Sequence, residues 1–418
     1  MKNRLITSRI QKKSLTKFGR IMVITGARQT GKTTLVRQAF PDFTYLSIED
    51  PVMRKSYASL SAPQWLANYP KAILDEIQKG PILVESIKSV YDQFEKPRYI
   101  LLGSSQILLL QKVKESLAGR SQIIELYPLT LPELLSKGWD DEVGLSFLQK
   151  YFLGEATLES LLPNFTLVKE FAAKKAGMDY FLDFGGYPAL TDSQLRDAER
   201  QEWLVNYVKT YLERDIRDLV ELRELEPFMK IQQMVALHTG KLINFSKLAK
   251  EAGVTSKTAQ RYLQYLEISY QAMILLPWYR NSLKKLVRTP KVHFLDPGIV
   301  NAILRKTKTV YGNEYESAVV AEIYKQIKSL QLPVQLYHLR TLDGREIDLL
   351  LETEAGYIPI EIKMSDHISE TDARNFRGLE EILDKPVLHQ FILSNDLEVK
   401  HLNPKTTSMP AAYFLTSF

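Results

Sequence analysis

The sequence contains no cysteine among its 418 residues, so disulfide bonds and thiolate metal sites are excluded. No apolar run approaches the roughly 20 residues that a membrane-spanning helix needs. The first segment, residues 1–13, is basic but lacks the apolar stretch of a signal peptide. We therefore expect a cytoplasmic protein without contact to a membrane.

The chain also lacks a fixed-period repeat and a low-complexity tract. Its length predicts two to four domains of ordinary globular composition. The formal net charge of +6 is mildly basic, which permits nucleic-acid binding without requiring it.

The first third of the sequence alternates short apolar runs with helical segments. This alternation predicts a parallel sheet that helices cover on both faces. The predicted strands are 20–25, 44–48, 71–75, 99–103 and 122–126.

A glycine-rich motif follows the first predicted strand and opens a helix over residues 33–40. In a phosphate loop of this pattern, backbone N–H groups and the helix N-terminus hold a phosphate chain. Lys32 would then reach the β- and γ-phosphates of ATP, and the Thr33 hydroxyl would bind Mg²⁺. The predicted nucleotide-binding residues are Gly26, Ala27, Arg28, Gln29, Thr30, Gly31, Lys32, Thr33 and Thr34.

An acidic pair ends the third predicted strand, at the edge where open α/β sheets bind ligands. We expect Asp75 to bind Mg²⁺, directly or through water, and Glu76 to orient or deprotonate the attacking water. The alternative is a helix-capping aspartate beside a solvated glutamate.

Two further positions of this region are candidates for the ATP site. Ser104, Ser105 or Gln106, after the fourth strand, can contact the γ-phosphate, or a serine there can simply cap a helix. Arg120 can stabilise the transferring phosphate charge, in the same chain or in a neighbour, or it can be an ordinary surface arginine.

These motifs together resemble those of AAA+-type P-loop ATPases. The set is similar to a large prokaryotic family of ATP-binding proteins whose C-terminal part is a domain of unknown function. The resemblance extends to Gly185-Gly186-Tyr187-Pro188, to the segment Tyr211–Asp215 and to Phe294–Gly298, so it covers nearly the whole chain. It implies the sheet order 5-1-4-3-2 and assembly of several copies, as a ring or a dimer.

The middle of the chain predicts a winged helix. Helices at 228–239, 246–252 and 256–268, with a turn at Gly253, have the spacing of a helix-turn-helix. Two strands joined by a basic loop follow, as in a wing. The predicted DNA contacts are Lys257, Thr258, Gln260 and Arg261 on the third helix and Arg280, Lys284, Lys285 and Arg288 in the loop. Such domains also serve as protein–protein modules, and that alternative stays open.

A hairpin near the C-terminus carries two acids and a lysine on one face. Residues 346–352 and 357–363 both alternate, and Thr353–Gly356 is a turn signal. With a four-residue loop, Asp348 faces Glu361 and Glu346 faces Lys363. Carboxylates so placed need a proton or a cation between them, and Mg²⁺ suits their oxygens.

A helix before the hairpin supplies a third acid, because Glu316 shares the inward stripe of that helix. The set Glu316, Asp348, Glu361 and Lys363 resembles the metal-dependent PD-(D/E)xK nuclease superfamily. The resemblance implies that the three acids bind Mg²⁺ or Mn²⁺ and that Asp348, Glu361 and Lys363 are catalytic. The alternative is a solvated hairpin or a nuclease site that has lost its activity.

The sequence thus predicts an α/β protein with four parts. They are a P-loop AAA+-like domain (1–140), a helical linker or lid (141–225), a winged-helix domain (226–300) and a PD-(D/E)xK-like α/β domain (301–418). The predicted function is Mg-ATP hydrolysis that acts on DNA, with a C-terminal domain that binds and can cleave DNA. The alternative is a nucleotide-dependent switch or regulator whose C-terminal domain binds DNA or protein without cleavage.

Overall fold

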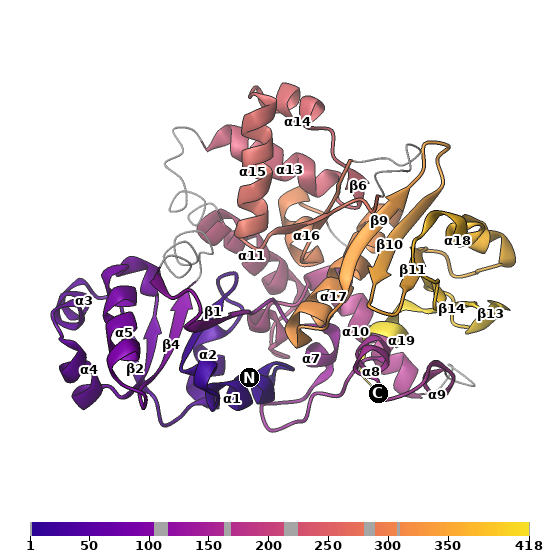
Figure 1. Cartoon of the computed structure of the whole chain (residues 1–418). Helices are drawn as coiled ribbons and strands as arrows, with labels where there is room; N and C mark the ends of the chain where they lie inside the picture. The colour runs from indigo at the N-terminus through magenta and orange to yellow at the C-terminus, as the bar shows by residue number, and fades with distance from the viewer. Residues whose placement is uncertain are drawn as a thin grey trace.

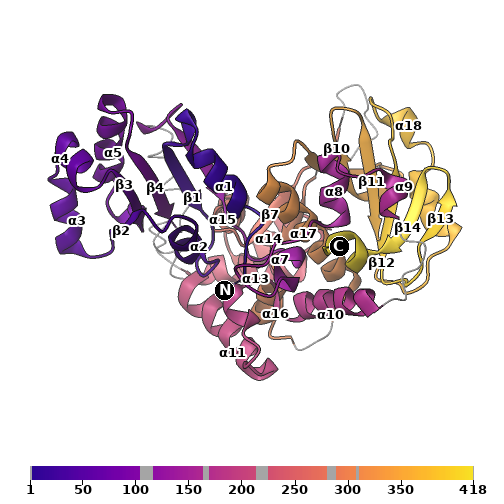
Figure 2. The same cartoon turned by 90° about the horizontal axis from the view of Figure 1, so that it is seen from below.

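The computed structural model describes residues 2–103, 116–162, 169–212, 225–279, 289–306 and 310–417. A five-stranded parallel sheet forms the N-terminal domain, and a six-stranded mixed sheet forms the C-terminal domain. The two sheets lie on opposite sides of the molecule, with the helices of the middle region between them (Figures 1 and 2).

The N-terminal sheet has the order β2-β3-β4-β1-β5, which confirms the order that the family resemblance implies. Strand β1 is buried along its whole length, and β3 and β4 are buried except at their first residues, as expected of a parallel sheet covered on both faces. All five predicted strands exist, and their ends differ by at most one residue from the prediction. The strands are β1 (Ile21–Thr25), β2 (Thr44–Ser47), β3 (Lys71–Asp75), β4 (Arg98–Gly103) and β5 (Ser121–Glu125).

Helices cover both faces of this sheet and connect its strands. Asp50 caps one of them by accepting a hydrogen bond from Val52 N at 2.7 Å, with Pro51 at the first helical position. The helical elements are α1 (Thr7–Ser14), η1 (Lys17–Gly19), α2 (Lys32–Ala39), α3 (Pro51–Ala58), α4 (Ala62–Asn68), η2 (Ile77–Lys79), α5 (Ile82–Gln93) and α7 (Leu131–Leu135).

The middle region is helical and its helices belong to two different cores. Phe147 and Phe181 pack in the core of the C-terminal sheet, whereas Tyr187 and Tyr207 pack with the winged helix. The elements are α8 (Phe147–Leu153), α9 (Leu158–Leu161), α10 (Lys169–Phe184), η3 (Pro188–Thr191), α11 (Asp197–Tyr207) and η4 (Val208–Leu212).

The winged helix follows, with three helices, a three-stranded sheet of order β6-β8-β7 and a further helix. Asn244 caps the second helix by accepting from Lys247 N, and Gly253, at the predicted turn, ends the helix in a left-handed conformation. The elements are α13 (Glu226–Leu237), β6 (Lys241–Leu242), α14 (Phe245–Ala252), α15 (Ser256–Ile268), β7 (Ala272–Leu275), β8 (Lys291–Phe294) and α16 (Pro297–Leu304).

The C-terminal sheet has the order β13-β14-β12-β11-β10-β9, and the long helix α17 packs against it. Its elements are α17 (Gly312–Leu330), β9 (Gln335–Arg340), β10 (Glu346–Glu352), β11 (Tyr357–Ile362), η5 (Glu370–Phe376), α18 (Leu379–Ile382), β12 (Gln390–Ser394), β13 (Lys400–Asn403), β14 (Thr406–Pro410) and α19 (Ala411–Leu415).

Candidate functional site

The loop between β1 and α2 has the geometry of a phosphate loop, and two glycines make it possible. Gly26 has φ +154°, and a β-carbon there would lie 2.1 Å from the carbonyl oxygen of Leu126. Gly31 has φ +88° and is the residue that precedes the first turn of α2. The loop therefore leads directly to a helix N-terminus, where a phosphate is favoured.

Lys32 turns back over this loop. Its Nζ donates to the carbonyl oxygens of Gly26 and Ala27, at 2.9 and 2.7 Å. The ammonium is thus already at the loop, where it can exchange carbonyl oxygens for phosphate oxygens. Arg28 and Gln29 lie at the outer part of the loop, and Thr34 is exposed on α2.

The predicted metal-binding side chains converge at the carboxyl end of β3. Thr33 Oγ1 donates to Asp75 Oδ2 at 2.7 Å, although 42 residues separate the two in the chain. A hydroxyl and a carboxylate in contact are a donor set that fits Mg²⁺, which keeps some of its waters. Tyr45 on β2 also donates to Asp75 Oδ2, at 2.8 Å, and the sequence analysis did not identify it.

The pKa of Tyr45 is raised above its usual value, first by burial and then by the charge of Asp75. Tyr45 therefore stays a neutral donor to the carboxylate. The signal in the sequence that could have identified Tyr45 is its position on the predicted strand next to β3, near the same edge of the sheet.

Glu76 sits at the end of β3 in a left-handed conformation, with φ +56°. Left-handed backbone is uncommon for a non-glycine residue and occurs preferentially at functional sites. Its Oε2 accepts from Gln78 Nε2 at 2.5 Å, which fixes the direction of the carboxylate. Ser104, Ser105 and Gln106 lie outside the described residues, so their predicted roles stay predictions.

The prediction that Arg120 acts on phosphate within its own chain is wrong. Arg120 directly precedes β5, and Ser121 pairs with Ile21 at the start of β1, whereas the phosphate loop follows the other end of β1. At about 3.3 Å per strand residue, the length of β1 separates them. Arg120 instead binds Asp92 at 2.7 Å. A role in a neighbouring copy stays a prediction.

Residues from outside the N-terminal sheet hold the phosphate loop. Arg4 donates to Thr30 O at 3.0 Å, and Tyr207 OH donates to Arg28 O at 3.0 Å. The hydroxyl groups of Thr25 and Tyr270 are 2.7 Å apart. Thr25 immediately precedes the loop, so the loop touches both the N-terminal segment and the middle of the chain.

Tyr270 lies between α15 and β7 with φ +60°. Its contact with Thr25 joins the winged helix to the nucleotide site across 245 residues of sequence. No local pattern in the sequence marks such a contact. The strained backbone shows that the surrounding packing fixes this tyrosine in place.

The three helices and two strands predicted for the winged helix exist, as α13, α14, α15, β7 and β8. The order helix, strand, two helices and two strands, with β8 between β6 and β7, is that of a winged helix. On α15, Lys257, Gln260 and Arg261 are exposed and Thr258 is half-buried. Within the described residues, neither Lys257 nor Arg261 forms an ion pair. The face predicted to meet DNA is therefore open.

The segment that leads from β7 into the predicted wing loop is tied to the C-terminal domain. Trp278 is buried, its Nε1 donates to Tyr357 OH at 3.0 Å, and its backbone N donates to His338 O at 2.7 Å. Arg280, Lys284, Lys285 and Arg288 lie outside the described residues, so their DNA contacts stay predictions.

Two motifs that the family resemblance rests on meet each other. Gly186 N donates to Asp296 Oδ2 at 2.8 Å, and a β-carbon on Gly185, which has φ +75°, would lie 1.9 Å from Asp296 Oδ1. Asp296 also accepts from Ile299 N and so caps α16. The motifs form a structural junction. In the Tyr211–Asp215 motif, only the backbone of its first two residues lies within the description.

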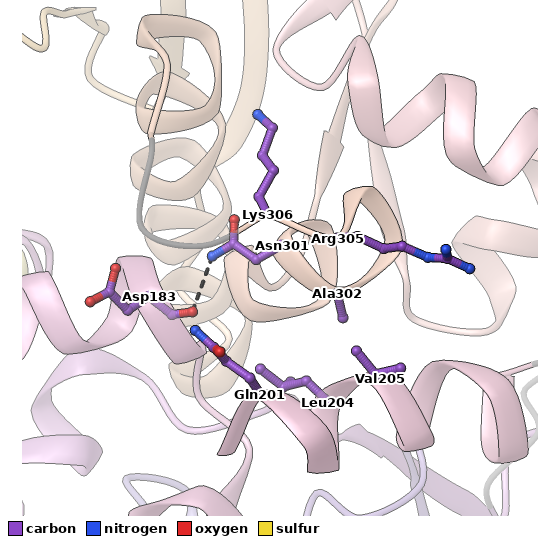
Figure 3. A pocket seen from close by; sticks show the side chains of 8 residues that line it. All are labelled: Asp183, Gln201, Leu204, Val205, Asn301, Ala302, Arg305 and Lys306. Carbon is purple, nitrogen blue, oxygen red and sulfur yellow. Dashed lines mark hydrogen bonds between the residues drawn. The ribbon is translucent and has the colours of Figure 1, made fainter. Parts of the chain in front are cut away.

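A pocket of about 200 Å³ opens beside this junction, between α11 and α16 (Figure 3). Asn301 Nδ2 donates to Asp183 O at 3.0 Å, and Lys306 is paired with Glu314. The polar groups named here have structural partners, and no predicted site residue lines the pocket.

The register of the C-terminal hairpin is confirmed where the two strands pair. Glu352 lies opposite Tyr357 and Leu350 opposite Pro359, as predicted. The ladder ends at the pair Leu349 and Ile360. Beyond it, Asp348 Oδ2 accepts from Ile362 N at 2.8 Å.

The predicted contact between Glu346 and Lys363 is wrong, because the paired part of the hairpin ends before it reaches them. Glu346 Oε2 binds Arg340 at 3.0 Å, and Lys363 Nζ binds Glu361 Oε2 at 2.8 Å. Glu361 is buried and its second oxygen accepts from Asn375 Nδ2 at 3.4 Å.

Two of the three predicted metal ligands, Glu316 and Asp348, contact a lysine that the sequence analysis missed, and Glu346 contacts it as well. Lys291 Nζ lies 2.8 Å from Glu316 Oε1, 2.5 Å from Glu346 Oε1 and 3.6 Å from Asp348 Oδ1. Lys291 comes from β8 of the winged helix and its side chain is 2% exposed. We call Glu316, Glu346, Asp348, Glu361, Lys291 and Lys363 the acid cluster.

Burial raises the pKa of Glu316 and of Glu361 to about 8, and the charge of Asp348 adds to the effect in both. Burial alone would lower the pKa of Lys291, but the charges of Glu316, Asp348 and Glu346 outweigh it and the pKa is raised. Lys291 is therefore a permanent cation, whereas burial disfavours the ionised forms of Glu316 and Glu361.

One signal could have identified Lys291. In the strand 291–294, Lys291 and His293 alternate with Val292 and Phe294, which predicts a polar face on a strand between two apolar segments. Both polar residues are buried. In the described parts of the chain, no group of three or more histidine or acidic residues is arranged to hold a metal ion.

Comparison with known proteins agrees with the N-terminal geometry. The model of a family described as "AAA domain" matches residues 19–135. The N-terminal region is a P-loop ATPase domain. Two models described as domains of unknown function, DUF8612 and DUF4143, match residues 177–309 and 311–414.

Similar proteins occur in bacteria and archaea. The chain is 27% identical over 356 residues to an uncharacterized protein of Mycobacterium bovis, covering 82% of this chain and 70% of that one. It is 22% identical over 329 residues to one of Methanocaldococcus jannaschii, covering 73% and 67%. A Walker-type ATPase of Pyrococcus abyssi has a TM-score of 0.41 and 15% identity, over 72% of this chain and 96% of that chain.

The ATPase domain is thus joined to two domains whose families are described as being of unknown function. None of the helices in the described ranges combines the length and the apolar character that crossing a membrane requires.

Proposed function

We propose that this protein is a Mg-ATP-hydrolysing ATPase that acts on DNA through its winged helix. The observation that carries the proposal is the arrangement at one edge of the ATPase sheet. There the phosphate loop, the Lys32 ammonium and the Thr33–Asp75 hydrogen bond lie together.

The residues present fit Mg-ATP. Thr33 and Asp75 would hold Mg²⁺, which when bound neutralises phosphate charge. The backbone N–H groups of the loop and α2 bind phosphate oxygens, and Lys32 provides a fixed positive charge at the transferring group. Glu76 follows Asp75 directly, and there it would orient the attacking water.

The proposal that DNA is the partner is supported by the exposed face of α15. Lys257, Gln260 and Arg261 lie in its first turns, where helices of this fold meet base edges and phosphates. The hydrogen bond between Tyr270 and Thr25 connects the end of this helix to the start of the phosphate loop. A DNA-bound winged helix would thereby influence the nucleotide site.

The test is the rate of ATP hydrolysis with and without duplex DNA, in wild type and in the double variant Lys257→Ala/Arg261→Ala. We expect DNA to raise the wild-type rate and the double variant to need more DNA for the same rate. The variant should also bind with a weaker salt dependence, because phosphate contacts are lost. Lys230→Ala/Lys250→Ala, on α13 and α14, is the matched control. A wild-type rate of ATP hydrolysis that does not change when DNA is added would contradict the proposal.

A second candidate is a nucleotide-dependent switch whose C-terminal domain does not cleave. The position of Lys291 favours it, because an ammonium group in contact with three carboxylates does not leave the acid cluster free to fit Mg²⁺. We therefore assign the cluster no cleavage step. DNA cut by the wild type in Mg²⁺ or Mn²⁺, but not by Asp348→Ala, would contradict this candidate. Assembly into a ring or a dimer stays a proposal, tested by the mass in solution with and without ATP.

A further inference from the structure

The acid cluster lies where two domains meet. Glu316 comes from α17, Glu346 and Asp348 from β10 and Glu361 from β11, all in the C-terminal domain. Lys291 comes from β8, in the sheet of the winged helix. The lysine is therefore the contribution of another domain to a set of acids that all belong to the C-terminal domain.

A metal ion bound to this cluster would use carboxylate oxygens. Groups of the chain itself already contact these oxygens. Asp348 Oδ1 faces Lys291, and Asp348 Oδ2 accepts from Ile362 N. Glu361 Oε2 accepts from Lys363 and Oε1 from Asn375. Glu316 Oε1 accepts from Lys291. A Mg²⁺ ion needs oxygen ligands at about 2.0–2.1 Å and would have to break these contacts.

The charge balance points the same way. Lys291, Lys363 and Arg340 bring three positive charges to four carboxyl groups. A divalent cation would add two positive charges to a buried set whose members already pair with one another. To bind, it would have to displace the ammonium group of Lys291.

The other ionisable groups near Lys291 do not change this balance. His293 and His338 are both fully buried, and burial, followed by the charge of Lys291, lowers their pKa values, for His338 to about 4. Both imidazoles are therefore neutral. Arg340 faces the cluster only through Glu346.

We propose that the ammonium group of Lys291 is the resident cation of the acid cluster and takes the place that the resemblance to nucleases gives to a divalent metal ion. The cluster then joins the winged helix to the C-terminal domain, and Mg²⁺ or Mn²⁺ binds to it only when Lys291 is removed. This inference is independent of ATP hydrolysis and of DNA binding, because neither involves the cluster.

The test is Mn²⁺ binding to the full chain without nucleotide, followed by electron paramagnetic resonance of the free ion. Five proteins are compared: wild type, Asp348→Asn, Lys291→Met, Lys291→Met/Asp348→Asn and Lys291→Arg. We expect wild type and Asp348→Asn to bind Mn²⁺ equally weakly. Lys291→Met should gain one site per chain, and Asp348→Asn should remove that site again. Lys291→Arg, which keeps the charge, should behave as wild type.

Two results would overturn the proposal. The first is a Mn²⁺ site in the wild type that Asp348→Asn removes, because the cluster would then hold a metal despite Lys291. The second is a folded Lys291→Met protein without a new site. If Lys291→Met does not fold, the comparison of wild type with Asp348→Asn decides alone. ATP turnover of the same samples separates this result from a failure of the proposed ATPase function.

Discussion

The phosphate loop and the acid cluster use the same kinds of side chain in opposite ways. Each combines carboxylates with lysines near the end of a strand. At the phosphate loop, Lys32 rests on carbonyl oxygens and Asp75 on hydroxyl groups, which are neutral partners that an ionic ligand can replace. In the acid cluster, Lys291 contacts carboxylates directly.

The difference teaches how to tell a site that awaits a ligand from one that is already satisfied. A neutral partner costs little to exchange, whereas a buried ion pair loses its compensation when one member leaves. Charged residues in a sequence motif therefore indicate a binding site only after their partners in the fold are known.

Lys291→Met should have the largest effect of the variants that distinguish the two regions. Removing one member of a buried ion cluster leaves carboxylates without compensation, so we expect the free energy of unfolding to fall by about 3–5 kcal/mol. Chemical denaturation monitored by tryptophan fluorescence measures it. The matched control is Lys405→Met, which removes an exposed ion pair with Glu380 and should cost about 0–1 kcal/mol. Equal losses in the two variants would contradict the buried cluster.

Lys32→Ala addresses the other region and should leave the fold intact. It removes the positive charge at the transferring phosphate, so we expect ATP turnover to fall by at least about 100-fold. Phosphate release at saturating ATP measures it, with the exposed Lys55→Ala on α3 as the control. Turnover within a factor of two of wild type would show that the phosphate loop is not the hydrolytic site.

The pH dependence of stability separates the regions further. Burial, followed by the charge of Asp348, raises the pKa of Glu361 from 4.5 to about 8. The folded chain thus holds a proton that the unfolded chain releases, and the free energy of unfolding falls as pH rises through this window. The slope is at most about 1.4 kcal/mol per pH unit for one group.

Glu361→Gln should remove this slope, so that its stability relative to wild type increases from about pH 5 to about pH 8. Denaturation at a series of pH values measures it, and Glu380→Gln, at an exposed position, is the control. Profiles of Glu361→Gln and wild type that stay parallel would exclude a protonated Glu361.

Tyr270→Phe should have the smallest effect. It removes one hydrogen bond to Thr25, worth about 0.5–1.5 kcal/mol, and keeps the ring. We expect the basal rate of ATP hydrolysis to change by less than about twofold, while the increase caused by DNA becomes smaller. Tyr265→Phe, in the helix α15 that precedes Tyr270, is the control. An undiminished response to DNA would show that this contact does not couple the domains.

Local pattern was sufficient for much of this fold. The five strands of the ATPase sheet each have apolar runs bounded by turns, and the hairpin register followed from the alternation of 346–352 and 357–363. Thr33 and Asp75 could be paired because each belongs to a recognisable motif and both motifs lie at one sheet edge.

The errors concern contacts between distant segments. Arg120 was a candidate for the ATP site because an arginine can stabilise phosphate charge, but it directly precedes a parallel strand whose other end reaches that edge. Lys291 was read as part of a wing, because no pattern within β8 shows that α17 and β10 pack on it. Tyr45 and Tyr270 each contribute a single hydroxyl group to a contact between distant segments. A single residue of this kind belongs to no periodic pattern that the sequence could reveal.

The helix α17 has a consequence for dissecting the protein. One face of it presents Glu316 to Lys291, and another presents buried Glu322, which accepts from Leu131 N at 2.6 Å beside the ATPase domain. A C-terminal fragment beginning at α17 would lack both partners. Its acids would gain an affinity for divalent ions that they lack in the intact chain. Nuclease-like behaviour of such a fragment would therefore result from the truncation and would not be a property of the whole protein.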